Sequence, residues 1–388
     1  MKKFVMVSLS LMLFSGCPPE PEQPEPGEPL AGLSTDELTR FDAGRAVFER
    51  IFTPDDGLGP LFNSTGCVSC HNQPVSGGSS AVTEVHATKF EPPDFCDPLF
   101  QEGGPVIQQQ ATPLLQDQGI EKEEIPPSAT SQALRSTPPV FGFGLVDGIP
   151  DSTILANQDP NDMDNDGISG RANRFIDGRL GKFGRKAFIP TLFDFNAGAF
   201  PLEQGITTPF QPAEETINGT PVPPETDPVP EPEVTEEDVQ AVDDFVRFLA
   251  PLPRKRVKDL SEKKEVERGE KLFEDIACAS CHIPSMQTGP SEVPALNHQT
   301  VFLYSDLLLH DMGSDLADVC LGLATPSEFR TELLMGLRFR NQFLHDGSAG
   351  TVEEAIERHA GEGEASRDAF TDLPEKDKQA LLKFLDTI

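Results

Sequence analysis

Two copies of the pattern C-x-x-C-H constrain this chain of 388 residues more than any other feature of its sequence. The first runs from Cys67 through Cys70 to His71, and the second reads CASCH at positions 278–282. This pattern is typical of c-type haem attachment. Two thioether bonds fix the edge of the porphyrin, and the adjacent histidine reaches the iron as proximal ligand. We therefore predict two covalently bound haem c groups, held by the cysteine pairs Cys67/Cys70 and Cys278/Cys281, with His71 and His282 as proximal ligands.

Two other uses of paired cysteines fit the spacing less well. A zinc ribbon places its two pairs roughly 15–20 residues apart, whereas 207 residues separate Cys70 from Cys278. A thioredoxin-like C-x-x-C pair needs no histidine after it, yet a histidine follows both pairs here. Haem attachment explains the two cysteines and the histidine in both copies of the pattern.

The sequence around the two motifs also repeats. Phe41, Gly44 and Phe48 share one helical stripe before the first motif, and Gly269 and Phe273 repeat the Gly–Phe spacing before the second. Amphipathic segments close the two halves with the similar strings VRFLAPL and LKFLDTI. Unrelated amphipathic helices could produce the same strings. A haem motif within each half favours a mainly α fold of two tandem cytochrome-c-like helical domains with long irregular loops.

The boundaries of these domains follow from composition. We predict an N-terminal cytochrome c domain at 31–253 and a C-terminal one at 254–388. The stretch 205–235 is rich in Pro, Glu and Thr, so it is expected to be a long loop before the final helix of the first domain.

The N-terminus has the pattern of an export signal. Residues 1–16 combine Lys2 and Lys3 with a short apolar run and small residues that lead into Cys17. This resembles the lipobox of bacterial lipoproteins, in which the cysteine is acylated; an ordinary secretory signal is the alternative. An acidic, proline-rich tether follows at 17–30. We expect a lipid-anchored protein on the periplasmic or cell-surface side of a bacterial membrane.

Net charge limits the partners. The chain carries 31 basic and 64 acidic residues, for a formal charge of −33. Nucleic acids and anionic membrane surfaces need basic residues for neutralisation, so both are excluded as partners. Membrane contact is expected through the lipid anchor alone. A basic electron-donor cytochrome, or a similar small redox protein, is the complementary partner.

Several long motifs resemble one known family. They are DNDGISGRANRF, KFGRKAFIPTL, LLLHDMG and FRTELLMGLRFRNQFLHDGSAGTVEEAIERHAGEG, together with the region around the first haem motif. These motifs resemble the bacterial di-haem oxidoreductase family, which is related to the di-haem cytochrome c peroxidases and the methylamine-utilisation di-haem enzymes. The resemblance implies two cytochrome c domains with peroxidase-type chemistry.

The resemblance also implies a distal ligand for the first haem. In the related peroxidases a displaceable histidine follows the CHN…GG segment. His86 lies fifteen residues after His71, at nearly that place. A histidine in a solvated loop is the alternative interpretation.

For the second haem, the relatives place a distal ligand shortly after the HDG segment. That position falls on His359, fourteen residues after His345. Met312 and Met335 are the alternatives for this ligand. His345 and His310 lie in resembling motifs and are expected to hydrogen-bond propionates or backbone.

Peroxide cleavage needs a general acid–base, because one proton must move between the two oxygens. In the relatives a glutamate serves, and the matching position here is Glu203, before the string GIT; Asp147 is a second candidate. A surface carboxylate is the alternative for either residue. The chain has no Trp, so it lacks the inter-haem tryptophan of the peroxidase relatives.

A calcium loop is indicated between the two motifs. Asp162, Asp164 and Asp166 alternate before a glycine, as in the first half of an EF-hand loop. Asn173 occupies position 12 in place of the usual glutamate, and Asp177 could contribute instead. A simple Asp/Asn/Gly turn is the alternative.

Cys96 and Cys320 remain after the lipid and haem cysteines are assigned. In an exported protein, pairing is favoured over two free thiols. We therefore predict a disulfide between Cys96 and Cys320 that clamps the two halves together.

These patterns predict an exported di-haem oxidoreductase of the peroxidase type, which passes electrons from a reduced donor through one haem to hydrogen peroxide or another small oxidant at the other. A di-haem electron carrier without substrate turnover is the principal alternative. Radical oxidation of a partner protein or polymer is a third possibility.

Overall fold

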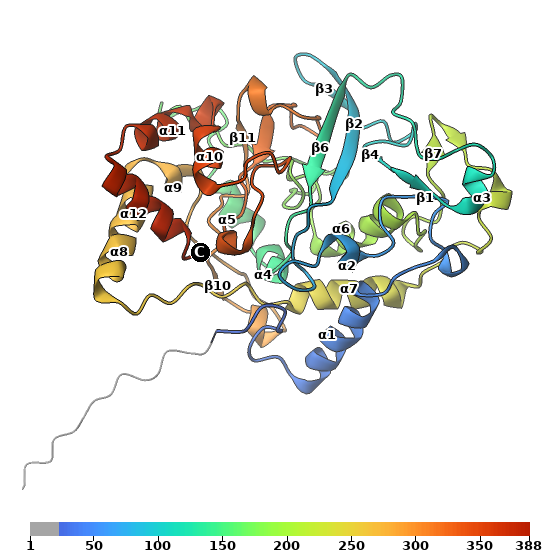
Figure 1. The fold of residues 1–388 in the computed structure, drawn as a ribbon, viewed down its shortest axis with the longest axis horizontal. Coiled ribbons are helices and arrows are strands. Elements are labelled where there is room, and N and C mark those ends of the chain that lie inside the picture. The colour runs from blue at the N-terminus through green and yellow to red at the C-terminus, as the bar shows by residue number, and fades with distance from the viewer. Residues whose placement is uncertain (1–22) are drawn as a thin grey trace, which may run out of the picture.

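The computed structural model describes residues 23–388 (Figure 1). The predicted signal peptide, Cys17 and the first part of the tether lie outside the described residues. Within residues 23–388, no helix combines the length and the apolar character that a membrane span requires.

Helices are the largest class of regular structure, and strands and long loops account for the rest. The α-helices are α1 Thr35–Phe48, α2 Cys67–Cys70, α3 Pro113–Gln116, α4 Phe143–Asp147, α5 Asp151–Leu155, α6 Leu192–Ala199, α7 Glu236–Phe248, α8 Leu260–Asp275, α9 Cys278–Cys281, α10 Val352–Glu357, α11 Glu364–Thr371 and α12 Glu375–Leu385. The strands are β1 Leu61–Phe62, β2 Thr83–Glu91, β3 Phe95–Asp97, β4 Val106–Ile107, β5 Gln110–Ala111, β6 Ser131–Ser136, β7 Thr216–Ile217, β8 Thr220–Pro221, β9 Met286–Gln287, β10 Thr300–Val301, β11 Leu309–Asp311 and β12 Glu328–Arg330. The mainly α prediction is thus confirmed only in part.

A small antiparallel sheet is the element that the sequence patterns did not predict. Strand β2 pairs with β3, β4 and β6. Its register with β6 places Glu84 opposite Arg135 and His86 opposite Ala133. Residues two apart on a strand point to the same face, so Glu84 and His86 project from the same side of this sheet.

Two crossed helix pairs frame the haem motifs, and each pair meets at a glycine. Helix α1 packs on α7, and α8 packs on α12 (Figure 1). A Cβ atom built on Gly44 would lie 2.0 Å from the carbonyl oxygen of Ala241, and one built on Gly269 would lie 2.0 Å from that of Ala380. Only glycine permits such close approach of two backbones, so the repeated Gly–Phe spacing marks equivalent helix crossings.

Local sequence explains where these helices begin. Ser34 caps α1 in a capping box with Glu37, and Thr235 caps α7 in a box with Asp238. In each box two of the backbone N–H groups at the helix start gain partners. Helix α7 then buries an apolar stripe that includes Val242 and Phe245.

The apolar core forms two main clusters. The larger one joins N-terminal helices such as α1 and α7 to residues of the C-terminal half, among them Met286, Leu303 and Leu333. The smaller one surrounds the α8–α12 crossing and contains Phe273, Phe384 and other residues of the C-terminal half. The segment between α9 and residue 333 therefore packs against the N-terminal half.

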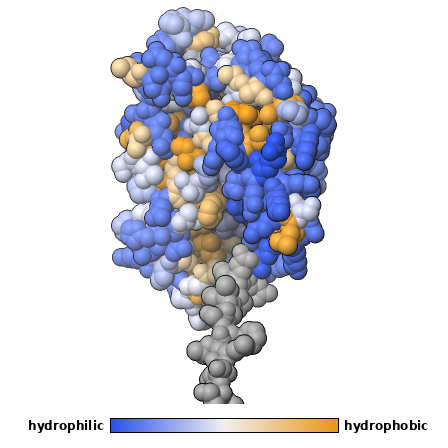
Figure 2. Space-filling view, turned by 90° about the vertical axis from the view of Figure 1, so that its left-hand side faces the viewer, coloured by the Kyte–Doolittle hydropathy of each residue, from blue (hydrophilic) through white to orange (hydrophobic). Residues whose placement is uncertain are grey.

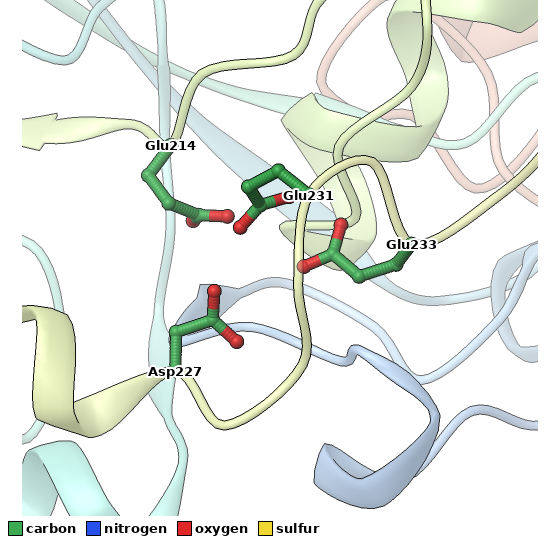
Figure 3. A group of neighbouring side chains, drawn as sticks. All are labelled: Glu214, Asp227, Glu231 and Glu233. Carbon is green, nitrogen blue, oxygen red and sulfur yellow. The ribbon is translucent and has the colours of Figure 1, made fainter.

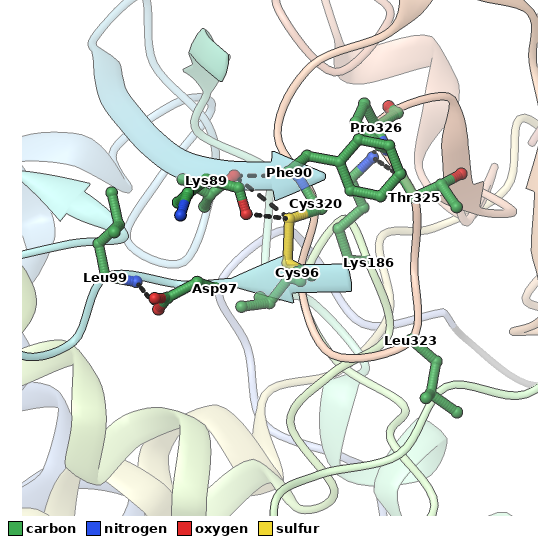
Figure 4. Close-up of a disulfide and its surroundings, with 12 residues drawn as sticks. Lys89, Phe90, Cys96, Asp97, Leu99, Lys186, Cys320, Leu323, Thr325 and Pro326 are labelled. Atoms are coloured by element: carbon green, nitrogen blue, oxygen red, sulfur yellow. Dashed lines mark hydrogen bonds between the residues drawn. A yellow bond between two sulfur atoms is a disulfide. The ribbon is translucent and has the colours of Figure 1, made fainter. Parts of the chain in front are cut away.

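A disulfide joins the two halves, as predicted. It links Cys96 of β3 to Cys320, with the Cα atoms 5.8 Å apart (Figure 4). The backbone N–H of Cys320 also donates to Thr88 Oγ1 of β2 at 3.2 Å. The bond fastens the segment around residue 320 to the sheet.

The face that carries the C-terminal helices is mostly hydrophilic, with hydrophobic residues in patches between the polar ones (Figure 2). This agrees with an acidic chain whose apolar residues, mainly Phe and Leu, are largely buried.

Candidate functional site

The first C-x-x-C-H motif lies in the wall of a cavity. Cys67 and Cys70 form helix α2, and both line the cavity together with His71. The ring Nδ1 atom of His71 lies 3.0 Å from the carbonyl oxygen of Gly78. This contact turns Nδ1 toward the backbone and fixes the orientation of the ring. Phe48 packs on the histidine ring, with centroids 6.0 Å apart.

The second motif repeats this arrangement. Cys278 and Cys281 form α9 and line a larger cavity with His282. The Nδ1 atom of His282 lies 3.0 Å from the carbonyl oxygen of Tyr304. Burial lowers the pKa of His282 to about 4, so the ring is the neutral imidazole that a metal requires.

Both sites fit a covalently attached haem. The four motif cysteines are free thiols and are not paired with each other. Burial raises the pKa of Cys67 and that of Cys278 to about 12. Each pair of thiols lies on the wall of an aromatic-lined cavity, together with the histidine of its own motif. A redox-active C-x-x-C pair would need an activated thiolate instead.

Glu203 lies in the first cavity, as the resemblance implied. It follows α6 in a single turn of π-helix, Phe200–Gln204, a feature that is frequent at functional sites. Its Oε2 atom is buried and has no hydrogen-bond partner among the described residues. Burial, followed by the nearby charge of Glu84, raises the pKa of Glu203 well above its usual value. Burial therefore favours the protonated form of this carboxyl group.

A second carboxylate in this cavity, Glu84, was missed by the sequence interpretation. Glu84 lines the cavity, whereas His86 does not. The Nε2 atom of His86 lies 3.2 Å from Glu84 Oε2. Burial alone would raise the pKa of Glu84, but the hydrogen bond and charge of His86 lower it. The structure thus differs from the prediction of His86 as an iron ligand, because Glu84 stands between this histidine and the cavity.

Asp147, the second candidate for the general acid–base, is held by hydrogen bonds outside the first cavity. Its Oδ1 atom accepts from the backbone N–H of Leu192 at 3.1 Å, and Oδ2 accepts from Arg247 at 2.7 Å. It does not line the cavity. Both oxygens are occupied, so Asp147 anchors the start of α6, the helix that leads to Glu203.

His359 lines the second cavity, on which His282 also lies. Its Nδ1 atom is 2.8 Å from the carbonyl oxygen of Ala355, one turn earlier in the chain. Burial lowers the pKa of His359. A neutral ring with its Nε2 free is suited to be the second axial ligand of this haem.

His310 and His345 also line this cavity, with different surroundings. The two ring nitrogens of His310 lie 2.7 Å from Asp306 and 2.7 Å from Glu362. Burial opposes the charged form, but these carboxylates raise the pKa of His310 to about 12, so it is an imidazolium and not a metal ligand. The ring of His345 stacks on Phe329 with centroids 4.4 Å apart.

Three arginines and one glutamate form a buried cluster in the wall of the second cavity. Glu332 accepts from Arg185 at 2.7 Å, from Arg340 at 2.8 Å and from Arg330 at 3.4 Å. Their guanidinium side chains are only 11%, 11% and 4% exposed, respectively. Three positive charges therefore face one negative charge. No lysine or arginine of residues 23–388 lines the first cavity.

The predicted calcium loop is assembled only in part. Asp162 and Asp164 lie together with Asp159, and one oxygen of each falls within 4.8 Å of the others. Asp159 was not predicted as a ligand. Asp166 does not belong to this group, because its Oδ1 atom accepts from the backbone N–H of Ile168 at 2.8 Å.

The prediction was wrong for Asn173, which is fully buried away from this loop. Its amide donates to the carbonyl oxygens of Lys186 at 2.7 Å and Leu321 at 2.9 Å, and its Oδ1 accepts from backbone N–H groups. The side chain therefore stabilises the backbone. Asp177 pairs with Arg179 at 2.7 Å and does not join the group either.

A second group of carboxylates lies in the loop 205–235. Glu214, Asp227, Glu231 and Glu233 point toward one another, and one oxygen of each lies within 4.8 Å of the others (Figure 3). Burial raises the pKa of Glu214 to about 8, and burial together with the neighbouring carboxyl groups raises that of Glu231 to about 10. At neutral pH these groups share protons.

One comparison with known proteins identifies a family. The family model described as "Di-haem oxidoreductase, putative peroxidase" matches residues 129–388. No curated protein sequence matches the chain. Among solved structures, the hydrazine synthase of Kuenenia stuttgartiensis is 13% identical with a TM-score of 0.42, covering 99% of this chain and 100% of that chain. A MauG-like protein associated with microbial copper homeostasis is 16% identical with a TM-score of 0.40, covering 96% and 95%. The diheme peroxidase BthA of Burkholderia thailandensis E264 is 15% identical with a TM-score of 0.34, covering 90% and 85%.

Proposed function

The chain belongs to the di-haem oxidoreductase family, and from that premise we propose that it is an exported, peroxidase-like enzyme with two covalently attached haems. Membership implies two haem groups and a redox function. The four motif cysteines would form the thioether bonds, and His71 and His282 would bind the two irons. The haems supply electrons and an iron position for the oxidant.

The observation that carries this proposal is Glu203 in the cavity of the first motif. Among the described residues, no histidine or methionine other than His71 lines that cavity, so no second side chain of these kinds would compete with a small oxidant for a haem held by His71. The raised pKa of Glu203 makes its ionised form a stronger base, and its Oε2 atom has no hydrogen-bond partner among the described residues. The ionised carboxylate would take a proton from one peroxide oxygen and, as the resulting carboxylic acid, deliver it to the other.

The second haem is the proposed point of electron entry. His282 and His359 lie on the same cavity, and both would bind the iron of this haem, as is typical of an electron-transferring haem. The donor is a basic cytochrome or a similar small redox protein, because the charge of −33 would attract it.

The remaining predictions extend the proposal. Export would place the chain on the periplasmic or cell-surface side of a membrane, anchored by a lipid on Cys17. Asp159, Asp162 and Asp164 would bind Ca²⁺ in a structural role, because their carboxylates converge in an exposed loop.

The test uses the haem-loaded protein and the variants Glu203→Gln and Glu121→Gln, the latter an exposed control. Electron paramagnetic resonance should show one high-spin and one low-spin haem. Oxidation of a reduced donor by hydrogen peroxide should fall at least a hundredfold in Glu203→Gln and remain unchanged in the control. Two low-spin haems that do not respond to peroxide would show an electron carrier instead.

A further inference from the structure

The arginine cluster of the second cavity, Arg185, Arg330 and Arg340, has more hydrogen-bond donors than partners. Glu332 and three backbone carbonyl groups occupy the terminal nitrogens, since Arg185 also donates to Ser136, Arg330 to Lys182 and Arg340 to Leu333. The Nε–H groups of all three arginines are buried and have no hydrogen-bond partner among the described residues. Buried donors of this kind are costly unless a ligand binds them.

The net charge of the arginine cluster also indicates that a ligand binds there. Three guanidinium groups surround the single carboxylate of Glu332, whose pKa stays low: burial alone would raise it, and the three arginines lower it. The cluster therefore carries an excess of two positive charges inside the protein. An excess of buried charge requires neutralisation, and two carboxylates would supply it.

The same cavity wall carries the second haem motif. Cys278, Cys281 and His282 lie on it together with the three arginines. A haem has two propionate groups, each a carboxylate, at the edge of its porphyrin. Guanidinium groups bind carboxylates with directed N–H···O bonds.

We infer that Arg185, Arg330 and Arg340 form the binding site for the propionates of the second haem. This inference rests on the proposed attachment of that haem to Cys278 and Cys281. The arginines hold the propionates in the ionised form and place positive charge beside the iron. Positive charge favours the reduced iron, so the cluster keeps the second haem readily reducible.

The control for the test is Arg338, which lies on the same segment. Its guanidinium donates to the carbonyl oxygen of Pro253 at 2.9 Å and does not line the cavity. Arg338→Gln therefore removes the same charge from a place outside the site.

The experiment is a potentiometric titration of the haem-loaded protein, with the two haems resolved by their electron paramagnetic resonance signals. Arg340→Gln and Arg330→Gln should each lower the ratio of reduced to oxidised second haem at a fixed potential about tenfold. The first haem should not change, and Arg340→Lys should recover most of the loss. Resonance Raman spectroscopy should show a shifted propionate bending band in the glutamine variants, which a purely structural role would not produce.

An unchanged second-haem potential and propionate band in Arg340→Gln, with haem content intact, would overturn the inference. If Arg330→Gln does not fold, the less buried Arg340 and Arg185 still provide the test.

Titration of the wild-type protein with sodium acetate distinguishes the source of the carboxylate. A propionate site should be insensitive to acetate, whereas an acetate-dependent potential would show that a free anion binds instead. The experiment does not measure peroxide turnover. A protein without peroxidase activity could therefore still confirm or contradict the propionate site.

Discussion

Arg135 donates two hydrogen bonds to a single oxygen of Asp318, from Nε at 2.9 Å and from Nη2 at 2.7 Å. Lys186 lies 2.7 Å from the other oxygen of Asp318. Both cations come from the N-terminal half, and the carboxylate lies two residues before Cys320. This buried ion cluster and the disulfide hold the same segment on the sheet.

Removal of the disulfide should therefore lower stability without loss of haem. We expect the double variant Cys96→Ser/Cys320→Ser to reduce the free energy of unfolding by about 3 kcal/mol, because the bond closes a loop of 224 residues in the unfolded chain. Urea unfolding followed by circular dichroism provides the measurement. Dithiothreitol should produce the same decrease in the wild-type protein, since thioether bonds resist reduction. If the double variant and the wild type were equally stable, the ion cluster alone would hold the segment around residue 320 on the sheet.

The glycines at the two helix crossings should tolerate no side chain. Gly44→Ala and Gly269→Ala each place a methyl group against a backbone oxygen, so we expect each to lower the free energy of unfolding by about 3 kcal/mol. Gly350→Ala is the matched control, because its nearest neighbour is the end of a glutamate side chain at 3.4 Å. Thermal unfolding of the three variants tests this. Similar stability of all three would mean that the helices can separate at no cost.

The identity of the ligand opposite His282 can be tested by Met substitution. We expect His359→Met to raise the ratio of reduced to oxidised second haem about a hundredfold at a fixed potential, because methionine ligation raises the haem potential. Met312→Leu is the control, since Met312 lines the same cavity. A spectroelectrochemical titration of both variants gives the answer. If only Met312→Leu alters the spectrum, Met312 is the ligand.

The carboxylate group in the loop 205–235 predicts a pH dependence of stability. Raised pKa values mean that the folded protein holds more protons than the unfolded chain, up to about pH 8 for Glu214 and pH 10 for Glu231. Stability due to these groups is therefore present at low pH and lost as pH rises. Buried neutral histidines such as His282 have the opposite effect, but only below pH 6.5. Lys186 opposes the loss only above about pH 8. Stability should fall between pH 6.5 and 8.

Glu231→Gln should reduce this fall. In the presence of a chelator we expect its Tm at pH 8 to exceed that of the wild type by about 2 °C, with little difference at pH 5.5. Glu225→Gln, an exposed change in the same loop, is the control. A lower Tm of Glu231→Gln at pH 8 would indicate that the carboxylate has a stabilising partner.

Local patterns were sufficient to predict the features that depend on short stretches of sequence. The Gly–Phe spacing predicted the helix crossing at Gly44 and its repeat at Gly269. The resemblance to the di-haem family placed Glu203 and His359 on the two cavities, and elimination among the cysteines gave the disulfide. Each of these depends on spacing within one segment or on a small number of alternatives.

The remaining features depend on contacts between distant segments. Strand β2 pairs with β6 about 45 residues later, and this pairing brings Glu84 into the cavity in place of His86. The arginine cluster combines Arg185 with Arg330 and Arg340, roughly 150 residues further along the chain. No local pattern marks these three arginines as neighbours, so the sequence alone did not indicate them.

The carbonyl partners of the two proximal histidines determine from which side of the first haem the chemistry must be assisted. A carboxylate partner would give an imidazole anionic character and strengthen the electron push from histidine to iron. His71 and His282 instead face the neutral carbonyl groups of Gly78 and Tyr304, and their push is correspondingly modest. If the first haem cleaves a peroxide, as proposed, the reaction would depend mainly on a proton supplied to the departing oxygen, and Glu203 would be the residue that supplies it. The Oε2 atom of Glu203 has no hydrogen-bond partner among the described residues, which suits this residue to that task.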